Sequence, residues 1–307
     1  MNSQPFDDIR ALIGDLKPAD EAASAASLKR LGQTAAPDAL GMLEPIIGWI
    51  AGWRGAPTLH RPIIALYAGA HAGAGDVAAT RAQLEAIAAG AAPVSRAALH
   101  LGAGLDVFDL AIDRPVGDPR LGPAMSEREC AATMAFGMEA LAKQPDLLVL
   151  GGLGGGAEFF ATALDYALKG ASAPSGESPR GEVAAAVDRA RGEAGDDPLQ
   201  LLRQLGGRET AAICGAIIAA GTQSVPVLLE GYPAAAAAAV LHACAPAAIA
   251  HCRVGQIGGE PGHRELAERL GLAPLFDLGI TLKDGTGSTA ALSLIKLACA
   301  LSPEVTV

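Results

Sequence analysis

Apolar residues recur every three or four positions over the N-terminal part of the chain, from Asp7 to about Trp53. This spacing is typical of amphipathic helices. One such stripe consists of Leu40, Leu43, Ile46, Ile47 and Ile50. We therefore expect residues 1–55 to form a small helical lobe, with a contribution from helices at the C-terminus. Residues 56–307 are long enough to form a second domain, and a single large domain is the alternative.

From residue 56 onward the pattern changes to short apolar runs that alternate with helical segments. The runs that we predict as strands are the segment IIALYA after Pro62, Leu105–Ile112, Asp146–Leu150 and Val225–Gly231. The predicted helices are Val77–Ala89, Met125–Ala142, Glu158–Lys169, a segment through Val187 and Arg191, Pro198–Leu205 and Glu209–Ala220. This alternation indicates an α/β fold, in which a parallel Rossmann-like sheet has helices on both faces and ligands bind at the carboxyl ends of the strands.

Two helix starts and one loop have local signals of their own. Ser126, followed by Glu129 three residues later, predicts a capped helix start, and Asp197 before a proline predicts another. The stretch Ala171–Gly181 is rich in Ser, Pro and Gly, which predicts a mobile loop.

The composition narrows the classes of partner. Aromatic residues make up only 4% of the chain, and alanine and glycine supply much of the apolar content, so we expect a core packed by close backbone approach. The net charge is −10 and the isoelectric point about 5.1. Because binders of phosphate backbones need a basic stripe, nucleic acid is not an expected partner.

The sequence also argues against export and against a membrane span. Its N-terminus carries acidic residues where a secretory signal would be basic, and no apolar segment follows. The apolar run Tyr232–Ile249 consists mostly of alanine and is interrupted by Pro233, His242 and Pro246. We predict a buried helix there, with a transmembrane span as the alternative. The expected location is cytoplasmic.

Cysteine spacing and short motifs bear on metals and cofactors. The chain has five cysteines, and no two are separated by the two-residue gap of a zinc or redox motif, so we expect reduced, buried thiols. The glycines of GGLGGG do not have Rossmann fingerprint spacing, and no P-loop, HExxH or GxSxG motif is present. No metal and no cofactor are expected.

Three glycine-rich segments follow predicted strands or precede helices: Ala68–Gly75, Gly151–Gly156 and Lys283–Thr289. Glycine lets a phosphate approach backbone N–H groups closely, and a helix N-terminus adds a partial positive charge of about half a unit. The candidate ligand-binding residues in these loops are Gly151, Gly154, Gly156, Gly285, Thr286 and Gly287. The alternative for any one loop is that packing alone requires the glycines. Three loops together favour a nucleotide or a sugar phosphate as ligand.

Three side chains beside these loops are candidates for chemistry. His71 lies in the first loop, where it either contacts a ligand or caps a turn. Glu230 ends a predicted buried strand, where a carboxylate is costly unless it binds a ligand, a backbone donor or a cation. Asp284 precedes the segment GTG, where it either acts as a general base or caps the turn through its own backbone.

Three blocks of sequence carry a resemblance to a known family: DDPLQLLRQLGGRETAAICGAIIAA, VPVLLEGYPAAAAA and GGEPGHRELAERLGLAPLFDLGITLKDGTGSTAAL. In order and spacing they resemble the C-terminal half of the nicotinate-nucleotide:dimethylbenzimidazole phosphoribosyltransferases, which assemble the lower ligand of cobalamin. Weaker similarity extends upstream through PAMS, LLVLGGLGGG and YAGAHAG. The resemblance is strong from Asp197 onward and fainter before it.

The resemblance implies that nicotinate mononucleotide donates its ribose phosphate to a benzimidazole-type base, giving α-ribazole phosphate and nicotinate. It also implies a homodimer without a cofactor. Such a reaction needs a carboxylate to accept a proton from the base, amides to hold the phosphate and an apolar slot. By position, Asp284 stands where the family has the catalytic glutamate of its GEGTG-like loop.

The chain departs from the family pattern in its other loops. The family segment GEMGIGNTT corresponds to residues 151–159, so that Gly152 replaces a functional glutamate and the Asn-Thr-Thr set is lost. Ala70 stands where the family has an aspartate. Glu158 is a candidate for supplying a carboxylate from a shifted position. These departures leave an alternative, a catalytically degenerate paralogue that binds nucleotides or bases or acts as a partner subunit.

Overall fold

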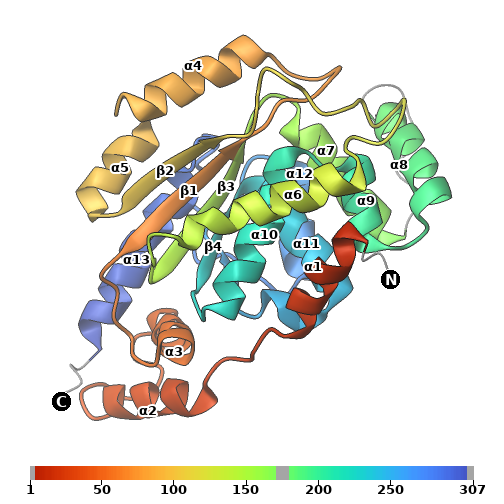
Figure 1. The fold of residues 1–307 in the computed structure, drawn as a ribbon. Coiled ribbons are helices and arrows are strands. Elements are labelled where there is room, and N and C mark those ends of the chain that lie inside the picture. The colour runs from red at the N-terminus through yellow and green to blue at the C-terminus, as the bar shows by residue number, and fades with distance from the viewer. Residues whose placement is uncertain (1–3, 171–179, 303–307) are drawn as a thin grey trace.

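A parallel sheet forms the centre of the protein (Figure 1). The computed structural model describes residues 4–170 and 180–302. In these ranges the strands are β1 (Pro62–Ala68), β2 (Gly104–Asp109), β3 (Leu147–Leu153), β4 (Val227–Glu230) and β5 (Cys252–Val254). They lie in the order β2-β1-β3-β4-β5, and every neighbouring pair is parallel. The predicted α/β class is confirmed, and the three-residue strand β5 is one that the sequence pattern missed.

Helices cover both faces of this sheet. The α-helices are α1 (Pro5–Gly14), α2 (Glu21–Leu31), α3 (Leu43–Arg54), α4 (Val77–Ala88), α5 (Pro93–Leu101), α6 (Glu127–Gly137), α7 (Ala157–Lys169), α8 (Arg180–Ala194), α9 (Pro198–Leu205), α10 (Arg208–Thr222), α11 (Gly231–Cys244), α12 (Pro261–Arg269) and α13 (Thr286–Leu301). Two short 3-10 helices are η1 (Met138–Leu141) and η2 (Pro246–Ile249). In Figure 1, α6, α10 and α11 lie in front of the sheet and α13 lies behind it.

Alternate residues of the strands face two separate apolar cores. Ile63, Ala65 and Tyr67 of β1 pack with residues of α6, α7, α10 and α11. Ile64 and Leu66 pack on the other side, with residues of α3, α5 and α13. Because successive strand side chains point to opposite faces, this alternation buries the sheet on both sides, as parallel sheets require.

The N-terminal helices are divided between these two cores. Phe6 and Ile9 of α1 pack in the core that contains α6 and α10. Ile47 and Ile50 of α3 pack in the opposite core, next to α13, and α2 lies against α3. The helices predicted to form a lobe of residues 1–55 therefore share the cores that cover the sheet.

Small residues allow two of the covering helices to approach closely. A Cβ atom on Gly215 of α10 would overlap the carbonyl oxygen of Met134 in α6. A Cβ atom on Gly137, at the end of α6, would overlap the carbonyl oxygen of Ala212. Packing by close backbone approach, as the composition predicts, is therefore confirmed at this helix pair.

Two predicted helix caps are also confirmed. The hydroxyl oxygen of Ser126 accepts a hydrogen bond from the Glu129 N–H at 3.1 Å. Oδ1 of Asp197 accepts from the Leu199 N–H at 3.0 Å. The mobile loop predicted from Ala171 to Gly181 falls mostly on residues 171–179, which lie outside the described residues.

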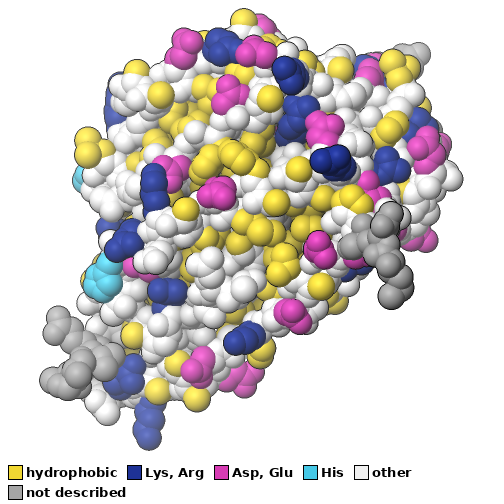
Figure 2. Space-filling view, viewed as in Figure 1, with side chains coloured by type: hydrophobic (Ala, Val, Ile, Leu, Met, Phe, Trp, Pro, Cys, Tyr) yellow, Lys and Arg dark blue, Asp and Glu magenta, His cyan; other side chains and the backbone are white. Residues whose placement is uncertain are grey.

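The alanine-rich run Tyr232–Ile249 forms α11 and η2, and α11 is buried through Leu241. In the described ranges, no helix is both long enough and apolar enough to cross a bilayer. On the face seen in Figure 2, Lys and Arg side chains are interspersed with Asp and Glu and form no continuous stripe. All five cysteines are free thiols, and Cys130, Cys214 and Cys252 are buried.

Candidate active site

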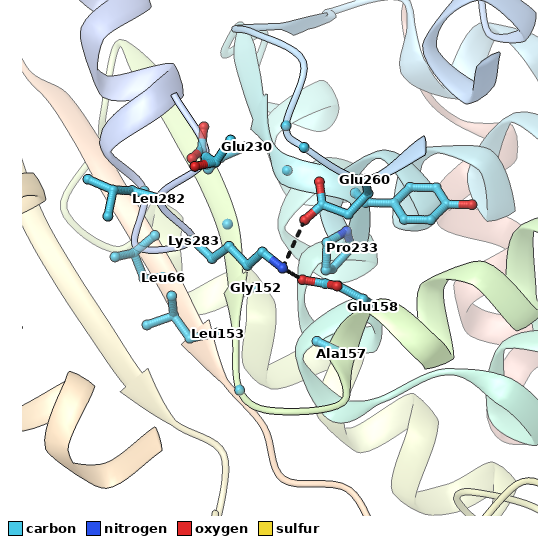
Figure 3. A pocket seen from close by; sticks show the side chains of 18 of the residues that line it. Leu66, Gly152, Leu153, Ala157, Glu158, Glu230, Pro233, Glu260, Leu282 and Lys283 are labelled. Atoms are coloured by element: carbon cyan, nitrogen blue, oxygen red, sulfur yellow. Dashed lines mark ion pairs between the residues drawn. The ribbon is translucent and has the colours of Figure 1, made fainter. Parts of the chain in front are cut away.

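A cavity of about 490 Å³ opens at the carboxyl end of the sheet, beside β3 and β4 (Figure 3). Its lining includes Leu66 of β1, residues 151–159 around the turn from β3 into α7, and Glu230 at the end of β4. The rest of the lining comes from Gln83, residues 231–233, Gln256, residues 258–260, residues 280–283 and Gly285. The sequence predicts a ligand at this edge of the sheet. The structure adds that the strand order reverses between β1 and β3, which is where ligands bind in sheets of this kind.

Apolar side chains form one wall of this cavity. Leu66, Leu153 and Leu282 lie on the same side in Figure 3, opposite the acidic side chains Glu158 and Glu260. Ile280 and Pro233 add to the apolar lining. A slot with apolar walls and a few convergent polar groups is typical of sites that bind flat aromatic ligands.

The glycine loop between β3 and α7 serves both packing and the cavity. Gly154 and Gly156 have φ angles of +130° and +90°, in the region that side chains rarely adopt. A Cβ atom on Gly155 would come within 2.6 Å of the Cα atom of Gly75, in the loop after β1. All three residues of the loop also line the cavity, together with Gly151. The packing requirement and the ligand-facing position therefore coincide in this loop.

His71 lies beneath this loop and does not line the cavity. Its side chain is buried, with Nε2 3.0 Å from Oε1 of Glu209 and Nδ1 2.9 Å from the carbonyl oxygen of Gly155. Burial lowers the pKa of His71, but the charge and hydrogen bonds of Glu209 and the bond to Gly155 raise it to a net value above the ordinary 6.5. Both neighbours accept hydrogen bonds, so the protonated imidazolium satisfies them. His71 thus fixes the glycine loop in place.

Glu230 is buried at the end of β4 and faces the cavity. Its Oε2 atom accepts a hydrogen bond from the backbone N–H of Ser288 in the first turn of α13. Burial raises the pKa of the Glu230 carboxyl, the bonds from Ser288 oppose that effect, and the neighbouring charge of Asp284 adds to it. Of the partners that the sequence left open for this carboxylate, the structure provides a backbone donor.

Asp284 is buried but turns away from the cavity, although Lys283 and Gly285 on either side of it line that cavity. Its Oδ1 atom accepts from the Thr286 N–H at 2.9 Å, and Oδ2 accepts from the Val94 N–H at 3.4 Å. The carboxylate therefore caps its own turn, which is one of the two alternatives that the sequence left open. The structure does not place it against the space that a substrate would occupy.

Some of the remaining predicted residues line the cavity and others do not. Gly285 lines the cavity with a φ of +97°, whereas Thr286 and Gly287 belong to the first turn of α13 and do not line it. Glu158 lines the cavity from the first turn of α7.

The sequence reasoning missed two lining residues, Lys283 and Glu260, which form an ion pair with each other. Lys283 also pairs with Glu158. The ammonium of Lys283 forms an ion pair with Glu158 and lies 3.4 Å from Oε1 of Glu260 (Figure 3). The only available signal for Lys283 was its position directly before Asp284. Glu260 had no signal, because its approach to the cavity depends on a contact between distant segments.

One lining residue, Gln256, also carries a buried acceptor without a protein partner among the described residues. The side-chain amide of Gln256 donates to the Ile280 carbonyl oxygen at 2.6 Å. Its Oε1 atom is buried and has no hydrogen-bond partner within the described part of the chain. Among the described residues no group of three or more His, Cys, Asp or Glu side chains has the arrangement of a metal site.

Comparison with known proteins gives one consistent result. A family model described as "Phosphoribosyltransferase" matches residues 16–307. The nicotinate-nucleotide–dimethylbenzimidazole phosphoribosyltransferase of Rhizobium johnstonii is 45% identical over 96% of this chain and 93% of its own length. The enzyme of that name from Sinorhizobium medicae has the same identity and coverage. The crystal structure of a protein of that name from Thermus thermophilus is 30% identical, with a TM-score of 0.82 over 92% of this chain and 96% of that chain.

Proposed function

The chain belongs to the nicotinate-nucleotide–dimethylbenzimidazole phosphoribosyltransferase family, and we propose that it transfers the phosphoribosyl group of nicotinate mononucleotide to a benzimidazole-type base. The products are nicotinate and α-ribazole phosphate, a precursor of the cobalamin lower ligand. The observation that carries the proposal is a cavity at the carboxyl edge of the sheet in which a glycine loop, an apolar wall and the buried carboxylate of Glu230 meet.

The reaction needs little covalent chemistry from the protein. A ring nitrogen of the base attacks C1′ of the ribose, the bond between C1′ and the pyridine nitrogen breaks, and the bonding electrons leave with nicotinate. The pyridine nitrogen loses its positive charge in this step, so the leaving group needs no proton. The imidazole ring of the base gives up its N–H proton, which requires a carboxylate within reach.

Glu230 is the best-placed proton acceptor. It faces the cavity, whereas the Asp284 carboxylate is directed to backbone N–H groups on the other side of its turn. Its raised pKa also favours proton uptake, because a stronger base accepts a proton more readily. We assign the proton-accepting role to Glu230 and a positioning role to Asp284, which stands next to it and whose turn leads into the helix that binds Glu230.

The apolar wall suits one substrate, the base, and the polar groups suit the other, the ribotide. The wall of Leu66, Leu153 and Leu282 suits the flat benzimidazole, which has few polar atoms. The glycine loop and the N-terminus of α7 suit the ribose phosphate. A base and a ribotide that bind in this way would share one cavity, where their relative orientation accelerates the reaction.

Incubation of the purified protein with nicotinate mononucleotide and dimethylbenzimidazole, followed by chromatography, tests the proposal directly. We expect α-ribazole phosphate and nicotinate to appear in equal amounts. Glu230→Gln is expected to lower kcat by roughly 100- to 10,000-fold, the usual contribution of a positioned acid or base. Glu139→Gln, an exposed change on η1, serves as the control and is expected to leave the rate unaltered. A wild-type protein that forms no product at high concentration contradicts the proposal.

A catalytically degenerate paralogue is the second candidate. It is favoured by the direction of the Asp284 carboxylate, which points away from the cavity, and by Gly152, which brings no carboxylate to the loop. Such a protein binds nicotinate mononucleotide or a base without turning it over, and it serves as a binding or partner subunit. Calorimetry that detects binding together with an assay that detects no product is the result that favours it.

We also propose that the protein acts as a homodimer in the cytoplasm. The support for both points is membership of the family, in which a cytoplasmic homodimer is expected. Sedimentation equilibrium tests the first point, and a mass of one chain of 30.8 kDa at micromolar concentration contradicts it.

A further inference from the structure

The side chain of Lys283 crosses the cavity and ends between two carboxylates from other parts of the chain (Figure 3). Lys283 precedes the turn into α13, Glu158 lies in the first turn of α7, and Glu260 is the residue before α12. Three segments that are distant in sequence thus meet at one ammonium group.

Lys283 is the only Lys or Arg among the described residues that line this cavity. Three carboxylates line it as well, those of Glu158, Glu230 and Glu260. A phosphate monoester carries a charge of about −1.5 to −2 near neutral pH, and the carboxylates repel it. Backbone amides of the glycine loop offset only part of that repulsion. A ribotide that binds here therefore needs the positive charge of Lys283.

The ion pair also stands at the boundary with a second cavity, of about 640 Å³. Lys283, Glu158 and Glu260 line both cavities. The second cavity has its own lysine, Lys169, but this ammonium is held at 3.1 Å by Asp165 and at 2.9 Å by Glu265. Lys283, in contrast, has a side chain that is 59% exposed and is free to change partners.

Glu158 occupies the place that suits a phosphate. Its carboxylate lies in the first turn of α7, where the helix dipole attracts an anion. The Glu158 side chain is 44% exposed, so that its displacement into solvent costs little burial. Oε2 of Glu260, in contrast, is buried without a hydrogen-bond partner among the described residues.

We propose, on the basis of the function proposed above, that Lys283 binds the phosphate of the ribotide and determines the specificity of the site for a phosphorylated donor. In the absence of the ribotide Glu158 takes the place of the phosphate, and binding exchanges one anion for the other at the same ammonium. Glu260 keeps the lysine side chain extended across the cavity during the exchange.

Calorimetric binding of three ligands to wild-type protein and to two variants tests this inference. Lys283→Ala is expected to lower the affinity for nicotinate mononucleotide by about 10- to 100-fold, the effect of losing a charge-assisted hydrogen bond. Nicotinamide mononucleotide keeps the phosphate and lacks the carboxylate, and we expect the same factor for it. Nicotinate riboside lacks the phosphate, and its affinity is expected to be equal in wild type and variant.

Glu158→Gln is the variant with the opposite expected sign. It removes the anion that competes with the phosphate and keeps the size of the side chain, so we expect nicotinate mononucleotide to bind severalfold more tightly. Lys143→Ala is the matched control for the loss of a lysine, because Lys143 is 65% exposed, pairs with Asp106 and lines neither cavity. It is expected to bind all three ligands as the wild type does.

Three results overturn the inference. One is wild-type affinity of Lys283→Ala for nicotinate mononucleotide. Another is an equal loss of affinity for nicotinate riboside in Lys283→Ala, which would mean that Lys283 binds a group other than the phosphate. The third is a Glu158→Gln variant that loses affinity as Lys283→Ala does. A wild-type protein that binds the ribotide but forms no product contradicts the proposed function alone and leaves these comparisons valid.

Discussion

The imidazole of His71, in the loop after β1, lies between two partners. It contacts Glu209 in the first turn of α10 on one side and the glycine loop after β3 on the other. Nε2 lies 3.0 Å from Oε1 of Glu209, and both side chains are buried. On its other side, Nδ1 lies 2.9 Å from the carbonyl oxygen of Gly155 in the glycine loop. The shape of that loop, and with it part of the cavity lining, therefore depends on a residue that does not itself line the cavity.

Replacement of His71 by Ala is expected to lower the free energy of unfolding by about 3–5 kcal/mol, because it leaves Glu209 buried without its partner. Urea unfolding monitored by circular dichroism measures this change. His100→Ala, an exposed change near the end of α5, is the control and is expected to cost less than about 1 kcal/mol. Equal losses in the two variants would contradict the role assigned to the buried pair.

The same pair predicts a pH dependence. The pKa of His71 in the folded protein lies above its ordinary value of 6.5. A group of this kind contributes its full stability below the unfolded pKa and loses it as pH rises through the folded pKa. The difference in unfolding free energy between wild type and His71→Ala is therefore expected to shrink over the pH range that begins near 6.5 and extends upward through the raised pKa of His71 in the folded protein. A constant difference over that range would show that the imidazolium is not the stabilising form.

A different pH dependence is expected for catalysis. Glu230 must be ionised to accept a proton, and burial holds its pKa above the ordinary value of 4.5. The rate is therefore expected to fall as pH decreases through this raised pKa, so that the acidic limb of the kcat/KM profile lies above the range of an exposed glutamate. Measurement of initial rates across the acidic range locates the limb. An acidic limb at the position of an unperturbed carboxyl would remove Glu230 from this role.

Features that depend on local pattern could be predicted from the sequence. The strands β1, β3 and β4 and the glycine loop after β3 follow from apolar runs that end in glycine, and Glu230 follows from its place at the end of such a run. The fold class and the edge of the sheet that carries the cavity therefore need no long-range information. The strand β5 was missed because three residues are too few to show a period.

Features that depend on partners far along the chain could not be predicted. One of the two bonds that hold the Asp284 carboxylate comes from Val94, 190 positions away, and the position of His71 is fixed by Glu209, 138 positions away. The ion pairs of Lys283 likewise require α7 and the start of α12 to lie next to each other. The sequence identifies Asp284 and His71 as candidates and not Lys283, and only the packing of the chain decides which of these residues line the cavity.

Substitutions of Asp284 test whether this residue only holds its turn in place or also acts on the substrate. Asn keeps an oxygen that accepts from the Thr286 N–H, so Asp284→Asn is expected to change the free energy of unfolding by less than about 0.5 kcal/mol, while Asp284→Ala is expected to cost about 1–2 kcal/mol. If Asp284 only positions the turn, the Asn variant also keeps most of the wild-type kcat. Loss of activity in the Asn variant with unchanged stability would instead return the proton-accepting role to Asp284. Thermal unfolding and the product assay, applied to both variants, separate these outcomes.

The contact between the loops after β1 and β3 makes the shape of the cavity sensitive to a single methyl group. Gly75 has a φ of +85°, and a Cβ atom there would overlap the backbone of Gly155. Gly90 has a similar φ of +74° but open space around it. Gly90→Ala is therefore expected to cost only the strain of a left-handed residue, about 1–2 kcal/mol.

Gly75→Ala is expected to cost about 1–3 kcal/mol more than Gly90→Ala, because the loop must also move. Since Gly155 lines the cavity, that movement is expected to lower the affinity for nicotinate mononucleotide as well, whereas Gly90→Ala leaves this affinity unchanged. Unfolding and calorimetry on the two variants measure the two effects separately. If Gly75→Ala loses stability but binds the ribotide normally, the glycines of the loop serve packing alone, and the phosphate site must be sought elsewhere along the cavity.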